Sequence, residues 1–295
     1  MEDVMKIKKA VIPAAGFGTR VLPATKNMPK EMFPIVDKPA IQYIVEEAVA
    51  AGITDILIIT NRGKNLMEDH FDYAPELEAT LKKAGKNEML EEVRSIANLA
   101  DITFIRQKEM KGLGHAVLKA KSFVGNEPFA IMFGDGVIHS ETKPAIKQLI
   151  DAYGVFGDGV LGVKKVPESE IHKYGSLKVE PIRDNLFKCT DMIEKPQRPE
   201  DVMSLYSITD RVVLPPSIFD ILEDTKPGAG GEIQLTDAMK VIAREKGMTA
   251  VEMEGKRFDI GNKFGILEAN IELGLKHPET KDKLREYIKE IAKTL

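Results

Sequence analysis

The sequence has one cysteine, Cys189, and its five histidines form neither an H-E-x-x-H motif nor a close pair. One cysteine excludes a disulfide framework within the chain and a cysteine-based zinc site. The histidines are more typical of surface or packing residues than of metal ligands. No apolar run reaches the ~20 residues of a membrane span. The N-terminal MEDVMKIKKA lacks the apolar core of a signal peptide. We therefore expect no membrane segment and a reducing, cytoplasmic location.

An excess of positive charge is also missing. The net charge is -4, which gives no indication of nucleic-acid binding. Hydrophobic residues make up 43% of the 295 positions, enough to bury a large core as one large α/β domain or two small ones. Internal repeats and low-complexity tracts are absent from the sequence. Composition therefore favours an ordinary globular protein with a large core.

Apolar runs and helical periodicities alternate along the chain. Continuous apolar runs such as 55–60 are typical of strands buried in parallel sheets, and helical spacing follows them. This alternation predicts an α/β fold: a Rossmann-like mixed, mostly parallel sheet covered by helices on both faces. Strands are expected near 10–13, 55–60, 102–105, 128–133, 160–163, 174–177, 187–193, 209–214 and 250–259. Helices are expected near 38–51, 64–98, 112–120, 216–224, 263–274 and 278–294, and another begins near Thr236.

Residues 10–34, AVIPAAGFGTRVLPATKNMPKEMFP, carry the clearest functional pattern. A short buried strand ends at Pro13 and is followed by a loop of small residues. Backbone N–H groups in such a loop can surround an anion. The loop residues are Ala14, Ala15, Gly16, Phe17 and Gly18. Three cations follow at Arg20, Lys26 and Lys30, and Arg and Lys suit phosphate oxygens. A glycine-rich connecting turn is the alternative, but spaced cations favour a triphosphate site.

Two familiar phosphate motifs do not fit this stretch. A dinucleotide fingerprint needs a third glycine, where this chain has Val21 followed by Pro23. A P-loop needs Gly-Lys before Ser or Thr, whereas Thr25-Lys26 has the opposite order.

The segments G-x-G-T-R-x-L-P-x-T-K and P-K-E-M-x-P-I resemble the signature of sugar-nucleotide pyrophosphorylases. Within that superfamily the chain is most similar to the bacterial-type UTP–glucose-1-phosphate uridylyltransferases. The likeness covers nearly the whole chain, near 10–45, 64–90, 105–120, 130–136, 174–196 and 228–270. The opening motif is specific for the superfamily but less so for uridylyl transfer. DHFDYAPELEATLKKAGK resembles an insertion that uridylyltransferases carry and shorter thymidylyltransferases lack.

Gln107 stands just past the strand expected at 102–105, where open parallel sheets bind ligands. Its amide offers a donor and an acceptor, which can complement uracil. The alternative is an exposed loop glutamine. The resemblance favours base reading, with Gly112 and Gly114 leaving room for the ring. The nucleotide-binding residues that it implies are Ala14, Ala15, Gly16, Gly18, Gln107, Gly112 and Gly114.

Asp135 follows the strand at 128–133, and a carboxylate there is a natural Mg²⁺ ligand. A turn aspartate is the alternative. The resemblance implies that Asp135 and Asp259 together bind Mg²⁺. Two positions depart from the family pattern. The chain has Gly136 where members often have a second acid, and Asp210 where they commonly have glycine.

The tripeptide Glu194-Lys195-Pro196 ends the strand expected at 187–193. Glu194 could accept hydrogen bonds from sugar hydroxyls, and Lys195 could neutralise a sugar phosphate. An isolated Glu-Lys is usually a surface ion pair. The resemblance assigns sugar-phosphate binding to Gly175, Glu194 and Lys195. Thr236 is a plausible helix N-cap or first-turn residue, either behind the site or in contact with substrate.

The resemblance implies Mg²⁺-assisted transfer of the uridylyl group of UTP to glucose 1-phosphate, giving UDP-glucose and pyrophosphate. Its implied catalytic residues are Arg20, Lys26 and Lys195. Two alternatives stay open: a related enzyme that uses dTTP or another sugar 1-phosphate, and a catalytically silent sugar-nucleotide sensor. Gly136 and Asp210 motivate the sensor, while the retained catalytic cations and both acids oppose it.

The expected organisation is a nucleotidyltransferase domain over 1–264, with a helical insertion near 64–98, and a C-terminal helical extension over 265–295 packed on the same domain. Leu284, Ile288, Ile291 and Leu295 form an apolar stripe that is more typical of a core-covering face than of an interface. We also expect a homo-oligomer, either a dimer or a tetramer.

Overall fold

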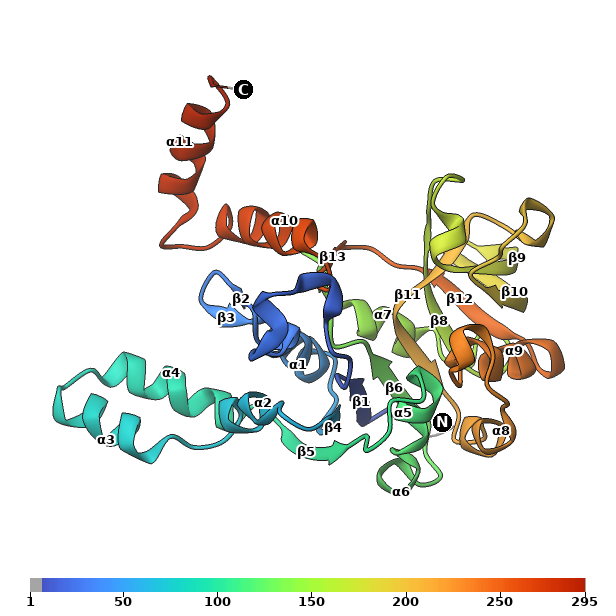
Figure 1. The fold of residues 1–295 in the computed structure, drawn as a ribbon, viewed down its shortest axis with the longest axis horizontal. Helices are drawn as coiled ribbons and strands as arrows, with labels where there is room; N and C mark the ends of the chain where they lie inside the picture. The colour runs from blue at the N-terminus through green and yellow to red at the C-terminus, as the bar shows by residue number, and fades with distance from the viewer. Residues whose placement is uncertain (1–6, 295) are drawn as a thin grey trace.

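The structure is a computed structural model, and it describes residues 7–294. Within this range nine strands form one sheet in the order β5-β4-β1-β6-β11-β8-β12-β10-β9 (Figure 1). Their bounds are β1 Lys9–Pro13, β4 Asp55–Thr60, β5 Asp101–Arg106, β6 Phe129–Met132, β8 Val160–Lys165, β9 Gly175–Arg183, β10 Leu186–Glu194, β11 Tyr206–Leu214 and β12 Met248–Glu252. Two short ladders lie beside it: β2 Pro34–Ile35 with β3 Lys38–Pro39, and β7 Gly136–His139 with β13 Lys256–Asp259.

Strand direction confirms the predicted mixed, mostly parallel sheet. β1 pairs in parallel with β4 and β6, β5 with β4, and β8 with β12. Only β11 and β10 run against the other strands of this sheet in the described range. Five of the six residues of β4 are buried, as a strand covered on both faces requires.

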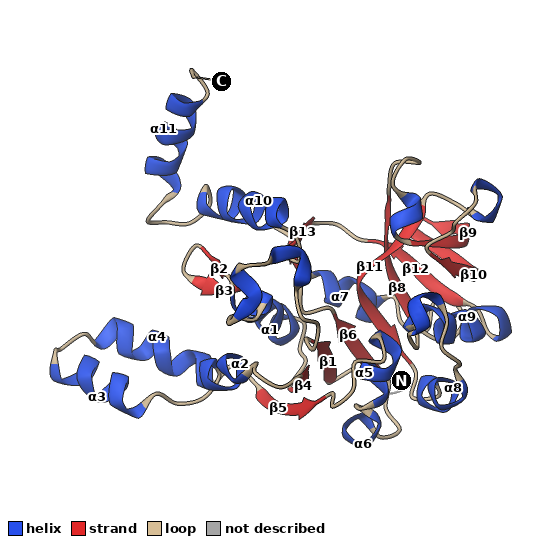
Figure 2. Ribbon diagram, in the orientation of Figure 1, coloured by secondary structure: helices blue, strands red, loops and turns tan. Residues whose placement is uncertain are grey.

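Helices cover both faces of the sheet (Figure 2). Alternate residues of a strand point to opposite faces, so the central strands contribute to two cores. One core contains Ile12, Ile56 and Ile58 together with residues of α1 and α7, and the other contains Val11, Leu57 and Ile59 together with residues of α5, α8 and α9. The helices are α1 Ala40–Ala50, α2 Asn65–His70, α3 Pro75–Lys83, α4 Asn87–Ala97, α5 Leu113–Leu118, α6 Lys121–Val124, α7 Ala145–Asp151, α8 Ile218–Asp224, α9 Leu235–Glu245, α10 Lys263–Gly274 and α11 Lys281–Ile291.

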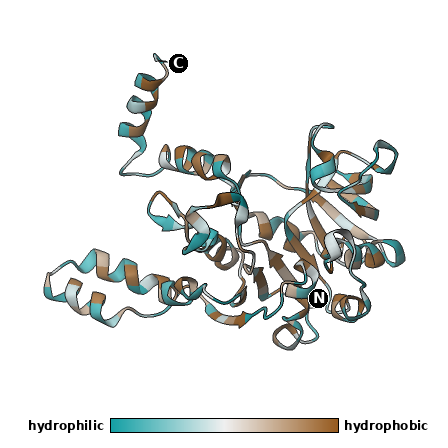
Figure 3. Ribbon diagram, viewed as in Figure 1, coloured by the Kyte–Doolittle hydropathy of each residue, from teal (hydrophilic) through white to brown (hydrophobic). Residues whose placement is uncertain are grey.

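The helical insertion predicted near 64–98 forms α2, α3 and α4. α3 and α4 lie side by side and project from the body (Figure 1). Each buries one residue, Leu81 and Leu90 respectively, and the rest of both helices is more exposed. Figure 3 shows hydrophilic and hydrophobic bands alternating along both helices. The insertion is therefore largely solvated, as its charged composition predicts.

The C-terminal helices differ in how they pack. α10 contacts β13 and β2 and buries residues such as Ala269 and Leu273. α11 contacts α10 but has no buried residue within Lys281–Ile291. The interpretation of its apolar stripe as a core-covering face is therefore wrong for the single chain, and Leu295 lies outside the described residues. The division at residue 264 stays a prediction. None of the helices in residues 7–294 is long and apolar enough to cross a membrane.

Candidate active site

Four loops meet at the carboxyl edge of the parallel strands. β1, β4, β5 and β6 are mutually parallel, so the segments after them start at the same edge. Open sheets bind ligands at such an edge. The loop 14–18 follows β1, Asn61 follows β4, Gln107 follows β5 and Asp135 follows β6. The tertiary structure thus gathers the predicted phosphate, base and metal residues.

The phosphate loop is anchored through its carbonyl groups. Lys64 donates to the carbonyl of Ala14, and Asn61 donates to the carbonyl of Ala15. Ala14 and Ala15 are buried, whereas Gly16 is exposed. Within residues 7–294 the N–H groups of residues 16–18 donate no hydrogen bond. Anchored carbonyls and available N–H groups suit an anion.

A buried ion pair that no sequence pattern predicts supports this loop. Lys64 Nζ lies 2.8 Å from Glu31 Oε2, and Glu31 has 0% exposure. Burial disfavours both charged forms, so it raises the pKa of Glu31 and lowers the pKa of Lys64, while each partner opposes the other's shift. Glu31 Oε1 has no hydrogen-bond partner within the described residues. The pair supports the loop at a cost in desolvation of both charges.

Asp135 and Asp259 converge, as the resemblance implies. A Cβ built on Gly261 would lie 2.8 Å from Asp135 Oδ2 and 2.9 Å from Asp259 Oδ1. Arg20 reaches both carboxylates, with N–O distances of 3.9 Å and 3.6 Å. Lys30, identified in the sequence only as a cation, lies closer to Asp135, at 2.5 Å. The site therefore combines two carboxylates with two cations.

The Asp135 carboxyl stays ionised despite its burial. Burial acts to raise its pKa, but the Lys30 ammonium, assisted by Arg257 and Arg20, outweighs burial and lowers the pKa. Lys26 is exposed on a short 3₁₀ turn, and no hydrogen bond or ion pair joins its side chain to the acids in the described chain. The structure thus brings Arg20 to the acidic pair but not Lys26.

One contact accounts for both departures from the family pattern. Gly136 begins β7 directly after Asp135, and Asp210 is 4% exposed on β11. A Cβ built on Gly136 would overlap the Asp210 carboxylate and lie 2.6 Å from its Cβ. Side chains at both positions would collide. The carboxylate is present at residue 210, so residue 136 has no side chain.

Gln107 is 4% exposed, so the alternative of an exposed loop residue is wrong. Its Nε2 donates to the carbonyl of Gly112 at 3.2 Å and lies 3.0 Å from His115 Nδ1. A carbonyl can only accept, which orients the amide: Nε2 faces Gly112, and Oε1 is left without a partner in residues 7–294. Burial and nearby lysines lower the pKa of His115, favouring the neutral ring that can accept from Gln107.

Gly112 and Gly114 have a packing reason to be glycine. A Cβ on either residue would lie 2.8 Å from the carbonyl oxygen of Ile233, and Gly112 has a φ of +98°. The N–H of Gly114 donates to that same carbonyl. The space beside both glycines is therefore filled by the segment before α9. Their contact with a base stays a prediction.

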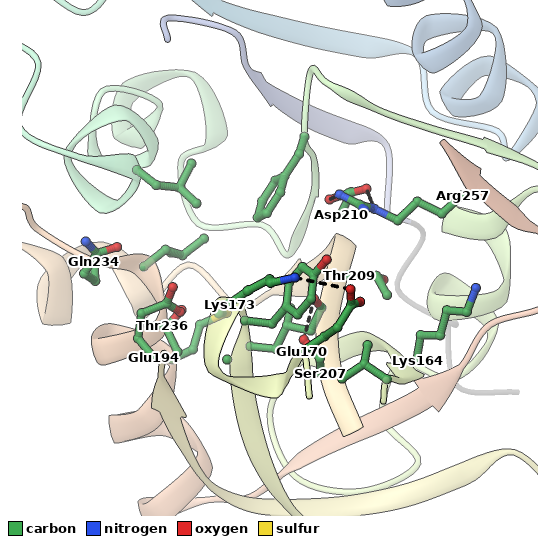
Figure 4. Close-up of a pocket in the computed structure, with 18 of the residues that line it drawn as sticks. Lys164, Glu170, Lys173, Glu194, Ser207, Thr209, Asp210, Gln234, Thr236 and Arg257 are labelled. Atoms are coloured by element: carbon green, nitrogen blue, oxygen red, sulfur yellow. Dashed lines mark hydrogen bonds and ion pairs between the residues drawn. The ribbon is translucent and has the colours of Figure 1, made fainter. Parts of the chain in front are cut away.

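A cavity of about 390 Å³ lies between β9, β10, β11 and the start of α9 (Figure 4). Gly175, Glu194 and Thr236 line it, and Gly175 is directly opposite Glu194 in the β9–β10 pair. Thr236, in the first turn of α9, donates to Glu194 Oε2 at 2.8 Å. It is therefore a first-turn residue at the cavity rather than a residue behind the site.

Lys195 follows directly on the strand that carries Glu194. Its φ is +46°, a left-handed conformation that is uncommon for a residue other than glycine. Its Nζ lies 3.6 Å from Glu194 Oε1, and its side chain is about half exposed. The ion pair is present, but it explains neither the unusual backbone nor the place of Glu194 in a cavity wall. Strained backbone is common at functional sites.

Sequence reasoning missed Asn61, Glu31, Lys64 and the part that Arg257 plays in lowering the pKa of Asp135. Asn61 and Lys64 follow a buried parallel strand, and this position could have identified them. Glu31 carried no comparable signal, because its partner is 33 residues away in the sequence.

The chain resembles known proteins over nearly its whole length. Residues 9–274 match the family model described as nucleotidyl transferase. The chain therefore belongs to the nucleotidyl transferase family. Its relatives include UTP–glucose-1-phosphate uridylyltransferase YngB of Bacillus subtilis (strain 168), 51% identical over 98% of this chain and 96% of the relative. A UTP–glucose-1-phosphate uridylyltransferase of Staphylococcus epidermidis is 50% identical over 97% of this chain and 99% of the relative.

Solved structures also resemble the chain over most of its length. A UTP-bound UGPase from Acinetobacter baumannii has a TM-score of 0.90 and 37% identity, covering 97% of this chain and 99% of that one. A UDP-glucose pyrophosphorylase complexed with UDP-glucose has a TM-score of 0.83 and 41% identity, covering 92% of this chain and 100% of that one. The resemblance drawn from the opening motif is thereby confirmed.

Proposed function

We propose that this protein transfers the uridylyl group of UTP to glucose 1-phosphate, giving UDP-glucose and pyrophosphate. The observation that carries the proposal is the convergence of Arg20 on Asp135 and Asp259, beside a phosphate loop with unpaired N–H groups. The names and bound ligands of the relatives support the choice of substrates.

The chemistry needs placement and charge more than proton transfer. A phosphate oxygen of glucose 1-phosphate is already anionic and can attack the α-phosphorus of UTP in line. The bond to the departing pyrophosphate breaks as the new P–O bond forms, so neither a covalent nucleophile nor a general base is required. Catalysis then rests on orientation and charge neutralisation. We assign Arg20 and Lys26 to the pyrophosphate and Lys195 to the attacking phosphate.

Mg²⁺ is the proposed cofactor, and the donor set fits it. Mg²⁺ is usually held by one or two carboxylates, with substrate phosphates and waters completing its shell. Asp135 and Asp259 supply two carboxylates, and no group of three or more acidic, histidine or cysteine side chains suited to a metal occurs in residues 7–294. Bound there, Mg²⁺ would neutralise phosphate charge. Lys30 would help to keep Asp135 ionised and in place.

Base recognition is assigned to Gln107, with the loop 14–18, Gly112 and Gly114 around it. Because the amide nitrogen of Gln107 is engaged by Gly112, its oxygen is the group available to a base. That oxygen can accept from N3–H of uracil but would face the unprotonated N3 of cytosine. Sugar binding is assigned to Gly175, Glu194 and Lys195, where the 390 Å³ cavity is lined by Gly175 and Glu194.

A homo-oligomer, dimer or tetramer, is part of the proposal. α10 and α11 carry large apolar side chains that stay exposed in the single chain, and a second copy would cover them. They are Phe264, Leu267, Ile271, Tyr287 and Ile291. Light scattering after size-exclusion chromatography measures the oligomeric state and tests this proposal.

A cytoplasmic location is supported by one cysteine that is buried and free.

The experiment that tests the function is pyrophosphate release over a matrix of nucleoside triphosphates and sugar 1-phosphates. We expect the highest kcat/KM with UTP and glucose 1-phosphate. A preference for dTTP or for another sugar phosphate would move the assignment within the family. Binding of UDP-glucose without turnover of any pair would instead indicate a sugar-nucleotide sensor.

A further inference from the structure

Two charged side chains that have no role in the proposed reaction lie on the wall of the 390 Å³ cavity assigned to sugar binding. Arg257 donates to Asp210 side-on, through Nε to Oδ2 and through Nη2 to Oδ1, the latter at 3.0 Å. Both residues line the 390 Å³ cavity, across from Glu194 and Thr236 (Figure 4). The pair is therefore placed to contact whatever occupies that cavity.

The backbone fixes the Asp210 end of this pair. The N–H of Phe133 donates to the carbonyl of Asp210 at 2.9 Å. Arg211, which is fully buried, donates to the same carbonyl and to the carbonyl of Gly136, both at 3.0 Å. Arg211 thus connects β11 to β7 at the point where the Asp210 carboxylate fills the space above Gly136.

Arg257 is also tied in register to the acidic pair. In the β7–β13 ladder Asp259 lies opposite Gly136, and Arg257 lies opposite Ile138. Residues two apart on a strand share a face, so Arg257 is on the same face of β13 as Asp259. Without Asp210, the Arg257 guanidinium would be free to pair with Asp259. The proposed metal site needs that Asp259 carboxylate.

The guanidinium has donors to spare. It carries five N–H bonds, of which the side-on pair with Asp210 uses two. The remaining three meet no acceptor in the described part of the chain. The side chain is 27% exposed at the cavity wall. Free N–H groups on a clamped guanidinium suit the oxygens of a phosphate.

We propose that Arg257 donates hydrogen bonds to the sugar 1-phosphate where the cavity meets the acidic pair, and that Asp210 is the residue that positions Arg257. The inference rests on the proposed function. It also gives Gly136 a role: only a residue without a side chain leaves room for the carboxylate that holds Arg257.

The first test separates substrate binding from stability. Asp210→Asn keeps the shape of the side chain that pairs with Arg257 but removes its negative charge. Arg257→Met removes the guanidinium donors. We expect KM for glucose 1-phosphate to rise roughly tenfold or more in both, the scale of one charge-assisted hydrogen bond, with KM for UTP changed by less than about twofold. The matched control is Asp201→Asn, which breaks the exposed side-on pair of Arg198 with Asp201. It should change neither constant.

The second test exchanges the residue types at positions 136 and 210. Gly136→Asp alone should lower the thermal midpoint, because its side chain overlaps Asp210. Adding Asp210→Gly should restore most of that midpoint and lower KM for glucose 1-phosphate relative to Asp210→Gly alone.

Three results would overturn the proposal: equal rises in both KM values, a lower thermal midpoint with both KM values unchanged, or no recovery in the double variant. The kinetics use whichever substrate pair the wild type turns over best. Absence of any wild-type turnover would contradict the proposed function. Turnover in which the variants do not raise KM for glucose 1-phosphate more than KM for UTP would contradict only this inference.

Discussion

Removing Lys64 should destabilise the protein strongly, because it leaves the Glu31 carboxyl buried without its partner. Lys64 Nζ lies 2.8 Å from Glu31 Oε2, and the two side chains are 7% and 1% exposed respectively. Breaking a buried pair by deleting one partner typically costs about 3–5 kcal/mol. Lys64→Met also removes the donor to the Ala14 carbonyl. We expect the free energy of unfolding to fall by about that amount, a large fraction of the ~5–15 kcal/mol of a typical domain.

The pH dependence has a definite sign. Burial raises the pKa of Glu31 in the folded state, and without Lys64 only Lys30 of its two cationic neighbours remains to oppose that shift. The folded variant then retains a proton that the unfolded chain loses above the ordinary value of 4.5. Its stability is greatest below 4.5 and falls as pH rises toward the raised folded pKa. The deficit of Lys64→Met relative to wild type should therefore be larger at about pH 8 than at about pH 5.

Denaturant unfolding at both pH values measures this effect. The double variant Glu31→Leu/Lys64→Met removes both charges of this buried pair, so it should regain most of the loss. Lys289→Met is the matched control: its pair with Glu286 has a similar distance, 2.9 Å, but both side chains are exposed, and it should matter far less. A fully stable Lys64→Met, or a double variant less stable than Lys64→Met alone, would refute the reasoning.

Three further predictions concern catalysis. Asp135→Asn should keep the fold and lower kcat at least ~100-fold, the scale of one lost electrostatic stabiliser; full turnover in EDTA, or an unimpaired variant, would exclude the metal role. Lys195→Ala should weaken glucose 1-phosphate more than UTP, by about 1.5–3 kcal/mol for a charge-assisted contact; titration showing the reverse would mean that Lys195 serves the other substrate. Gln107→Leu should reduce the UTP-over-CTP ratio of kcat/KM by roughly 10-fold or more, since a mismatched buried acceptor costs about 1–3 kcal/mol; an unchanged ratio would remove Gln107 from the base site.

Local patterns were enough for most of the fold. The buried run at 55–60 became β4 with the same bounds, because a continuous apolar segment has few alternatives to a covered strand. The expected start of α1 was two residues early, since Lys38–Pro39 pairs with β2 before the helix begins. β7 was not expected, because Gly136–His139 is a strand only through its pairing with β13.

The sequence by itself determined most of the elements, the phosphate loop and the position of Asp135 and Asp259 at strand ends. These features depend on spacing within one segment, which sterics and burial convert directly into local structure. Only the tertiary structure decided that Lys30 pairs with Asp135, that Lys64 supports the loop through Glu31, and that Asp210 fills the space above Gly136. Each of these contacts joins residues from different elements. Strand order and register determine which side chains then become neighbours, and the spacing within a single segment contains neither.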